Sequence, residues 1–118
     1  MIQPAKSFKD LVVWQKAHEL VLGTYKVTAQ FPKDELYGLT SQIRRSASSI
    51  AANIAEAFKK RSEKDKLRIL NIGQGSLSET QYHLLLANDL KYAELRALEA
   101  KAEEVSRLLE SYMKAIRK

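Results

Sequence analysis

Apolar residues recur at intervals of three and four along most of this 118-residue sequence, the spacing of one face of an α-helix. The pattern divides into four segments, at about residues 10–30, 35–59, 63–90 and 94–117. The last segment is the most regular, with an unbroken run of Leu95, Leu98, Ala102, Val105, Leu109, Tyr112 and Ile116. No alternation typical of a β-strand competes with this pattern. The sequence therefore predicts four helices and an all-α fold.

Polar and helix-breaking residues mark the ends of these segments. Ser7 and Asp10 have the spacing of a capping box, and Ser62 stands before the acidic first turn of the third segment. Pro32 ends the first segment, because a proline disfavours a helical residue before it. The connections are short, so each helix runs back along its predecessor. We expect one domain over residues 1–118, an antiparallel up-down-up-down four-helix bundle.

The predicted core stripes differ in composition. In the first segment the stripe is Leu11, Trp14, His18, Val21, Tyr25 and Thr28, which predicts that His18 is a packed core residue rather than a ligand. The second stripe is apolar, with Leu36, Leu39, Ile43, Ala47, Ile50, Ile54 and Phe58. The third is partly polar, with Leu67, Leu70, Gln74, Leu77, Gln81, Leu84 and Asn88. Gly73 and Gly75 interrupt this segment, and we expect them to permit a tight helix crossing.

Charged residues are nearly absent from the middles of the second and third segments. Residues 46–57 contain only Glu56, and residues 69–88 contain only Glu79 and His83. A helix of a monomeric bundle carries charge on its outer side. An ordinary surface rich in alanine and serine is one explanation, but the loss of charge in both segments favours burial by another subunit. We predict a homo-oligomer with interface or register residues Ser41, Arg44, Arg45, Ser48, Ala52, Asn53, Ala55 and Glu79.

Basic residues gather at one end of the predicted bundle, and their excess there equals the net charge of the chain, +6. Cations in the last turn of a helix complement its dipole, but Lys64, Lys66 and Arg68 begin a helix, where positive charge is unfavourable. A phosphate backbone is a natural ligand for such an end, because counterion release drives its binding. The candidate nucleic-acid-binding residues are Lys59, Lys60, Arg61, Lys64, Lys66, Arg68, Lys114, Arg117 and Lys118.

Signatures of catalysis, metal binding and membrane insertion are missing. The sequence has no cysteine and two histidines, and Glu79 and His83 lack the three-residue spacing and partner carboxylates of di-iron bundles. No serine stands in a recognisable pattern with a base and an orienting group. No apolar run has the length of a signal peptide core or a membrane span. We expect a cytoplasmic protein that is not an enzyme and uses no cofactor or metal.

Four sequence motifs carry a resemblance to a known family. In order, they are Val13–Ala17, Leu39–Ala47, Asn53–Glu56 and Gly75–Glu79. They resemble the bacterial four-helix-bundle family named for open reading frames in 23S rRNA intervening sequences, over nearly the whole chain. The resemblance implies an antiparallel subunit that assembles into a ring-shaped homopentamer. It also implies kinship with the accessory protein of diversity-generating retroelements, which binds a reverse transcriptase and nucleic acid through basic surfaces.

Two functions follow from these patterns and stay open at this point. The first is an oligomeric adaptor that binds the backbone of RNA or DNA through the basic end, with a nucleic-acid-processing protein as a further candidate partner. The alternative is a protein–protein scaffold whose basic end meets an acidic protein and binds no nucleic acid. For the polar motif residues we expect a pair between Arg44 and Glu79 that fixes helix or subunit register.

Overall fold

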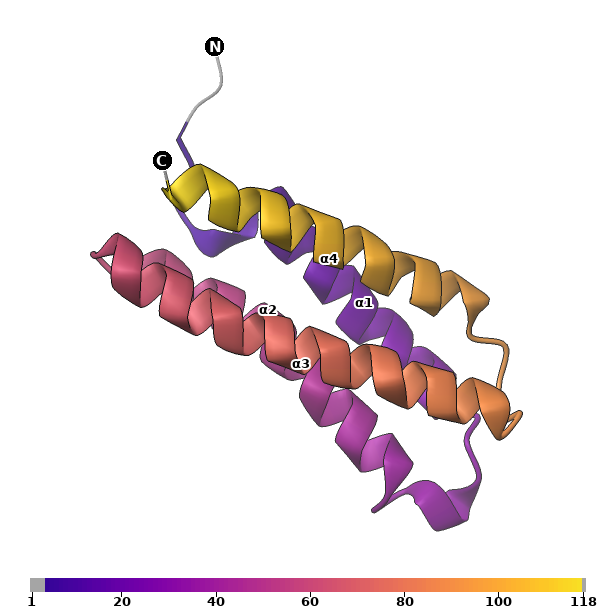
Figure 1. Ribbon diagram of the computed structural model, residues 1–118. Helices are drawn as coiled ribbons and strands as arrows, with labels where there is room; N and C mark the ends of the chain where they lie inside the picture. Colours follow the sequence, from indigo (N-terminus) through magenta and orange to yellow (C-terminus); the bar gives the residue numbers. More distant parts are fainter. Residues whose placement is uncertain (1–3, 118) are drawn as a thin grey trace.

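The computed structural model describes residues 4–117, which form four α-helices joined by short turns (Figure 1). The helices are α1 (Val12–Thr28), α2 (Leu39–Lys59), α3 (Glu63–Asp89) and α4 (Arg96–Arg117). A 3-10 turn precedes α1 (η1, Phe8–Asp10) and another precedes α2 (η2, Lys33–Glu35). No strand occurs in this part of the chain. The predicted all-α fold is confirmed, and each helix lies within its predicted segment.

The helices form an antiparallel bundle in which each helix adjoins the next along the chain and α4 also adjoins α1, with the most extensive packing between α2 and α3 (Figure 1). The bundle measures 46 × 27 × 19 Å. The start of α1 and the end of α4 lie at the same end as the turn between α2 and α3, and the other two turns lie at the opposite end (Figure 1). This arrangement brings the N-terminal, central and C-terminal basic residues of the chain to one end.

The core is built mainly from aliphatic side chains on the predicted stripes of α2 and α4 and on part of the stripe predicted for α3. Of the third stripe Leu70, Leu77 and Leu84 are buried but Asn88 is exposed, and Leu36 of the second is exposed before α2 begins. Fully buried residues include Ile43, Ile50 and Ile54 of α2, Leu70 and Leu84 of α3, and Val105 and Leu109 of α4. Their spacing of three and four places them on one face of each helix, so that four apolar faces meet along the bundle axis. Burial of each such side chain contributes on the order of 2 kcal/mol.

The predicted core stripe of α1 is wrong by a rotation of the helix. The buried residues are Val13, Ala17, Leu20, Thr24 and Thr28, whereas Trp14 is half-buried and His18 and Tyr25 are exposed. The two threonines satisfy their hydroxyls locally: Thr24 Oγ1 donates to the Leu20 carbonyl and Thr28 Oγ1 to the Thr24 carbonyl, both at 2.7 Å. Such backbone bonds remove the cost of burying a hydroxyl, so threonine can occupy a core position.

The predicted caps are present, one of them at a shifted place. Ser62 Oγ accepts the Asp65 amide at 3.0 Å and caps α3. The capping box of Ser7 and Asp10 closes η1, and α1 begins after Leu11. Pro32 stands directly before η2, three residues after Ala29, the C-cap of α1, so the helix ends before the proline is reached. Hydrogen bonds between residues close in sequence therefore determine where α3 begins and where η1 closes.

Candidate nucleic-acid interface and uncharged side

The basic end is formed where α2 ends and α3 begins, beside the C-terminal turns of α4 (Figure 1). Lys59 is in the last turn of α2, Arg61 is in the three-residue connection that ends at the Ser62 cap, and Lys64 is in the first turn of α3. All three side chains are exposed. Among residues 4–117, no carboxylate lies within salt-bridge distance of any of them. These cations are free to meet an external anion.

Other basic residues at this end are loosely paired within the chain. Lys60 lies 3.9 Å from Glu56, Arg68 lies 4.0 Å from Asp65, and Arg117 lies 3.7 Å from Glu110. These pairs are long and exposed, and such pairs contribute little to stability. Lys114 is exposed as well. Lys118 lies outside the described residues.

Lys66 has a structural contact that distinguishes it from the rest of the basic end. Its Nζ donates to the carbonyls of Ala57 and Phe58 at 3.2 and 2.9 Å, and it lies 5.7 Å from the centroid of the Phe58 ring. These carbonyls are among the four that the end of α2 leaves without helical partners. Lys66 thus caps α2 from α3, which accounts for its positive charge near a helix start without any ligand.

The seam between α2 and α3 contains polar side chains that bond to one another. Thr80 Oγ1 donates to Ser46 Oγ at 2.8 Å, and the hydroxyls of Ser49 and Ser76 share a hydrogen bond of 2.8 Å. Asn53 Nδ2 donates to the Ser49 carbonyl at 2.7 Å. No buried side-chain polar atom of the described residues lacks a partner. A seam with every group satisfied fixes the register of α2 on α3.

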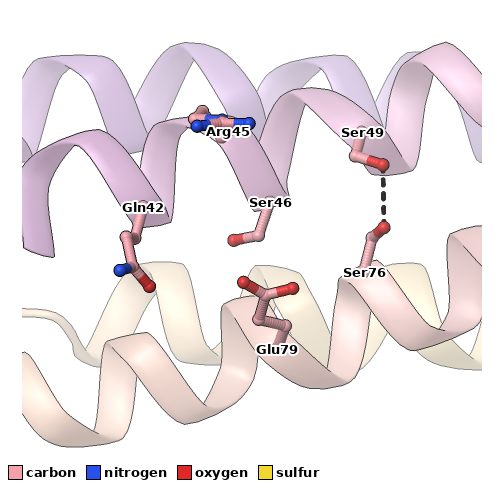
Figure 2. A pocket seen from close by; sticks show the side chains of 6 residues that line it. All are labelled: Gln42, Arg45, Ser46, Ser49, Ser76 and Glu79. Carbon is pink, nitrogen blue, oxygen red and sulfur yellow. Dashed lines mark hydrogen bonds between the residues drawn. The ribbon is translucent and has the colours of Figure 1, made fainter.

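A shallow pocket of about 300 Å³ opens over this seam (Figure 2). Its lining residues are Gln42, Arg45, Ser46, Ser49, Ser76 and Glu79. Ser46 is buried and its Oγ lies 3.5 Å from Nδ1 of the buried His83, whose Nε2 lies 3.9 Å from Glu79. A nucleophilic serine needs a free hydroxyl in a short bond to its base. The Ser46 hydroxyl instead accepts from Thr80, so the group serves the seam rather than nucleophilic chemistry.

The predicted pair of Arg44 and Glu79 is not formed. Arg44 Nε donates to Thr28 Oγ1 at 2.8 Å, and its Nη2 donates to the Tyr25 carbonyl at 3.3 Å. Its guanidinium also lies 4.7 Å from the centroid of the Tyr25 ring. The reason is the position of Arg44 on the flank of α2 that faces α1, whereas Glu79 lines the opposite flank. Arg44 therefore joins α1 to α2.

Charge is distributed unevenly around the bundle. The seams of α4 carry charged groups, because Lys101 Nζ binds Glu19 of α1 at 2.7 Å, and Gln74 of α3 donates to Glu110 at 2.9 Å. The side formed by α2 and the adjoining flanks of α1 and α3 carries few charges. On it, Ser41, Ser48 and Ala55 are half-buried, as is Asn53, and Ala52 and Arg45 are exposed. The predicted interface residues thus lie on this side, which we name the uncharged side because Arg44, Arg45 and Glu79 are its few charges. Their role as an interface stays a prediction.

Large apolar side chains are exposed on both flanks of this side. Leu22 of α1 is 57% exposed, and Tyr82 and Ile72 of α3 are 57% and 49% exposed. The apolar flank of α1 was not predicted from the sequence, because its His18 and Tyr25 were assigned to the core and Leu22 to no stripe. The signal was available: α1 carries two sets of apolar residues with helical spacing, and one helix face cannot hold both.

Neither a metal centre nor a membrane span is found in the part of the chain that the structure describes. No group of three or more histidine, cysteine, aspartate or glutamate side chains within residues 4–117 is arranged to hold a metal ion. The four helices are each too short or too polar to cross a bilayer.

Comparisons with known proteins agree with the fold. Residues 9–111 match the sequence model of the family described as 23S rRNA-intervening sequence protein. A similar solved structure is the crystal structure of a protein of unknown function from the S23 ribosomal protein family of Bacteroides thetaiotaomicron VPI-5482, at 1.70 Å resolution. The two chains are 30% identical with a TM-score of 0.78, over 87% of this chain and 99% of that one. A comparison with curated proteins gives no match.

Proposed function

Because the chain belongs to the family of 23S rRNA-intervening sequence proteins, whose solved relative has no known function, we propose a role from its own surface: a non-catalytic oligomeric adaptor that binds the phosphate backbone of nucleic acid. The basic end is the binding surface, and the uncharged side holds the copies together. The observation that carries the proposal is the exposed trio of Lys59, Arg61 and Lys64 without carboxylate partners among residues 4–117.

The position of these cations supports a ligand rather than a role within the fold. Lys64 lies in the first turn of α3, where the partial positive charge of the helix end opposes it. Lys66, which also lies there, is explained by its bonds to the end of α2. No such contact accounts for Lys64 or for Arg61.

Assembly increases the positive electrostatic potential of the binding surface. Copies related by rotation about an axis along the bundle present their basic ends on the same side, so their fields add. A nucleic-acid backbone that crosses several copies binds each further copy as an intramolecular step. The proposal therefore needs both the basic end and the oligomer.

The test is the salt dependence of binding to a 20-base-pair RNA hairpin and to a DNA duplex of the same length. We expect the affinity to fall steeply with salt, because counterions are released. Changing Lys59, Arg61 and Lys64 together to glutamine lowers the slope of log affinity against log salt by about 2 to 3, since each lost phosphate contact removes about 0.9.

The matched control removes the same charges from the opposite end. Lys33, Lys91 and Arg96 are exposed, and their change to glutamine also removes three cations. The control retains the slope of the unchanged protein if the basic end is the binding surface. Absence of binding at about 50 mM salt, or an equal loss of slope in the two triple variants, contradicts the proposal. Binding of an acidic polypeptide such as polyglutamate in place of either nucleic acid indicates the scaffold function instead.

A further inference from the structure

The outer flank of α1 carries a row of large side chains, half-buried Trp14 and exposed His18, Leu22 and Tyr25, which we name the α1 stripe. Leu22 and Tyr25 are 57% and 46% exposed. The rings of Trp14 and His18 stack with centroids 4.9 Å apart and an interplanar angle of 10°. Since Arg44 of α2 covers the Tyr25 ring, the stripe lies on the flank of α1 next to α2. The stacked rings, together with Leu22 and Tyr25, form a largely apolar surface.

The outer flank of α3 carries a second row, Ile72, Gly75, Tyr82 and Leu90, which we name the α3 stripe. Ile72, Tyr82 and Leu90 are 49%, 57% and 47% exposed. Glu79 lies within this row and lines the pocket shared with α2, so the α3 stripe is also next to α2. The two stripes therefore lie on opposite sides of α2, on different flanks of the same uncharged side.

Gly75 is an exposed glycine in the middle of α3, and nothing within the chain explains it. A Cβ at this position would meet no atom within 4 Å. At Gly73, by contrast, a Cβ would lie 3.4 Å from Cβ of Asn53, so that glycine serves the crossing of α2 over α3. Glycine weakens a helix, and in a helix interior it often marks a close approach of another backbone. At Gly75 no other part of the described chain comes this close, so any backbone that approaches there belongs to another molecule.

Over most of their length the two stripes are bordered by charges of opposite sign, although Glu19 also lies beside the α1 stripe and Arg68 beside the start of the α3 stripe. Lys26 and Arg44 border the α1 stripe, whereas Glu79 and Asp89 lie along the α3 stripe. Self-pairing of either stripe would bring like charges together, whereas contact between the two stripes pairs them. Complementary charge of this kind selects the partner surface and its register.

The two stripes also stand at matching levels. Glu19 of α1 accepts from Lys101 at 2.7 Å, and Gln81 of α3 donates to Glu103 at 3.4 Å. Lys101 and Glu103 lie within one turn of α4, so Glu19 and Gln81 lie at about the same height along the bundle axis. Because α1 and α3 run in the same direction, the α1 stripe beyond Glu19 is level with α3 between Tyr82 and Leu90. A neighbour related by rotation about an axis along the bundle presents its α3 stripe at that level.

We propose that the α1 stripe of one copy packs against the α3 stripe of the next, in a head-to-tail contact between two different surfaces. The inference rests on the proposed oligomeric adaptor and specifies which surfaces meet. A contact between different surfaces propagates around a ring when the rotation closes. Each stripe offers on the order of 300 Å² of exposed apolar side chain. The small residues of α2 beside it extend this toward the roughly 800 Å² that each partner contributes to a standard interface.

The test uses variants that damage one surface each. Leu22→Glu places a carboxylate in the α1 stripe, and Tyr82→Glu places one in the α3 stripe. The control is Val12→Glu, because Val12 is 56% exposed on the flank of α1 that adjoins Leu108 of α4. The mass of each is measured by light scattering after size exclusion in about 0.5 M salt, with circular dichroism to verify folding.

We expect Leu22→Glu and Tyr82→Glu each to be monomeric and Val12→Glu to assemble as the unchanged protein does. An equimolar mixture of the two monomeric variants forms a 1:1 heterodimer of about twice 13.4 kDa, because one undamaged surface of each kind remains. If either substitution unfolds the chain, Tyr25→Glu and Ile72→Glu take their places.

Two results overturn the inference: a mixture that stays monomeric while the unchanged protein assembles, or Leu22→Glu or Tyr82→Glu variants that assemble normally. An unchanged protein that is itself monomeric overturns the inference and the oligomeric half of the proposed function. The nucleic-acid-binding half of the proposed function has its own test: it is wrong if the triple variant at Lys59, Arg61 and Lys64 binds nucleic acid as the unchanged protein does.

Discussion

At the scale of single residues, Glu35 joins two turns at the end opposite the basic residues. Its Oε1 accepts the Leu39 amide at 3.0 Å, at the start of α2, and its Oε2 accepts the Tyr92 hydroxyl at 2.7 Å, before α4. Gly38 leaves room for this carboxylate, since a Cβ there would lie 2.7 Å from Glu35 Oε1. The Leu39 amide and then the Tyr92 hydroxyl hold the pKa of Glu35 below its ordinary value. Bonding to Glu35 raises the pKa of Tyr92.

This contact predicts an acid-sensitive part of the stability. A carboxyl group whose pKa is lowered by folding stabilises the folded state above its unfolded pKa of 4.5, and the effect is lost as pH falls through the folded value. Glu35→Gln retains an acceptor but cannot ionise. We expect its melting temperature to be a few degrees lower at pH 7 and to approach that of the unchanged protein near pH 3. Thermal melts at both pH values test this, and a difference that is constant with pH contradicts it.

The sequence predicted the Ser7 and Ser62 caps, because the capping acceptor and the amide it binds lie within three residues. It could not predict Glu35 or Lys66 in the same way. The Glu35 contact to Tyr92 joins residues 57 positions apart, and Lys66 caps α2 from another helix. Such contacts depend on how the helices pack, which the local pattern does not contain.

At the scale of the helices, the predictions succeeded where one face alone was apolar. The stripe predicted for the last segment agrees with the burial of Leu95, just before α4, and of Ala102, Val105 and Leu109 within it. The prediction failed for α1, because its outer row has larger apolar and aromatic side chains than its core row, which includes Ala17, Thr24 and Thr28. Hydrophobicity alone cannot decide which of two apolar rows faces the bundle, since surfaces that bind partners are apolar too.

The two glycines of α3 give a prediction at this scale. In the monomeric Leu22→Glu background, Gly75→Ala is expected to raise the free energy of unfolding by about 1 kcal/mol, because alanine favours helix and its Cβ meets open space. Gly73→Ala is expected to gain less, since its Cβ would lie 3.4 Å from Cβ of Asn53, at the short limit of ordinary contact. Chemical denaturation of the two variants measures the difference. Equal gains at both positions would contradict the assignment of Gly73 to the crossing of α2 and α3.

In the otherwise unchanged chain, Gly75→Ala separates stability from assembly. The same methyl group that favours the helix occupies the place where the neighbouring copy approaches. We expect the mass measured at low micromolar concentration to shift toward the monomer although the fold is more stable. A variant that is both more stable and equally assembled would show that no backbone approaches Gly75.

At the scale of the whole molecule, assembly and nucleic-acid binding are predicted to be coupled. Leu22→Glu lies far along α1 from the basic end and leaves Lys59, Arg61 and Lys64 unchanged. Its monomers should nevertheless bind a long duplex on the order of 100-fold more weakly than the assembled protein, because avidity is lost. Titrations at one fixed salt concentration compare the two. Equal affinities would show that a single basic end acts alone.

The overall charge pattern was available from the sequence because it follows from topology. Once four antiparallel helices are assumed, the residues that share an end are determined by chain order, and Figure 1 has the α2–α3 turn and both chain ends together. The sequence could not distinguish exposed Lys64 from engaged Lys66, two residues later in the same helix. That distinction requires the position of the last carbonyls of α2.

The start of α1 and the end of α4 both lie at the basic end, which has a practical consequence for handling the protein. An affinity tag or fluorophore fused at either end would sit at the proposed binding surface, and a polyhistidine tag would add its own affinity for phosphates. The turn at Lys91, whose backbone has a φ of 62°, is exposed at the far end of the bundle. A cysteine-free sequence offers no competing thiol, so a single cysteine introduced near this turn provides a clean attachment point for a reporter or a sensor surface.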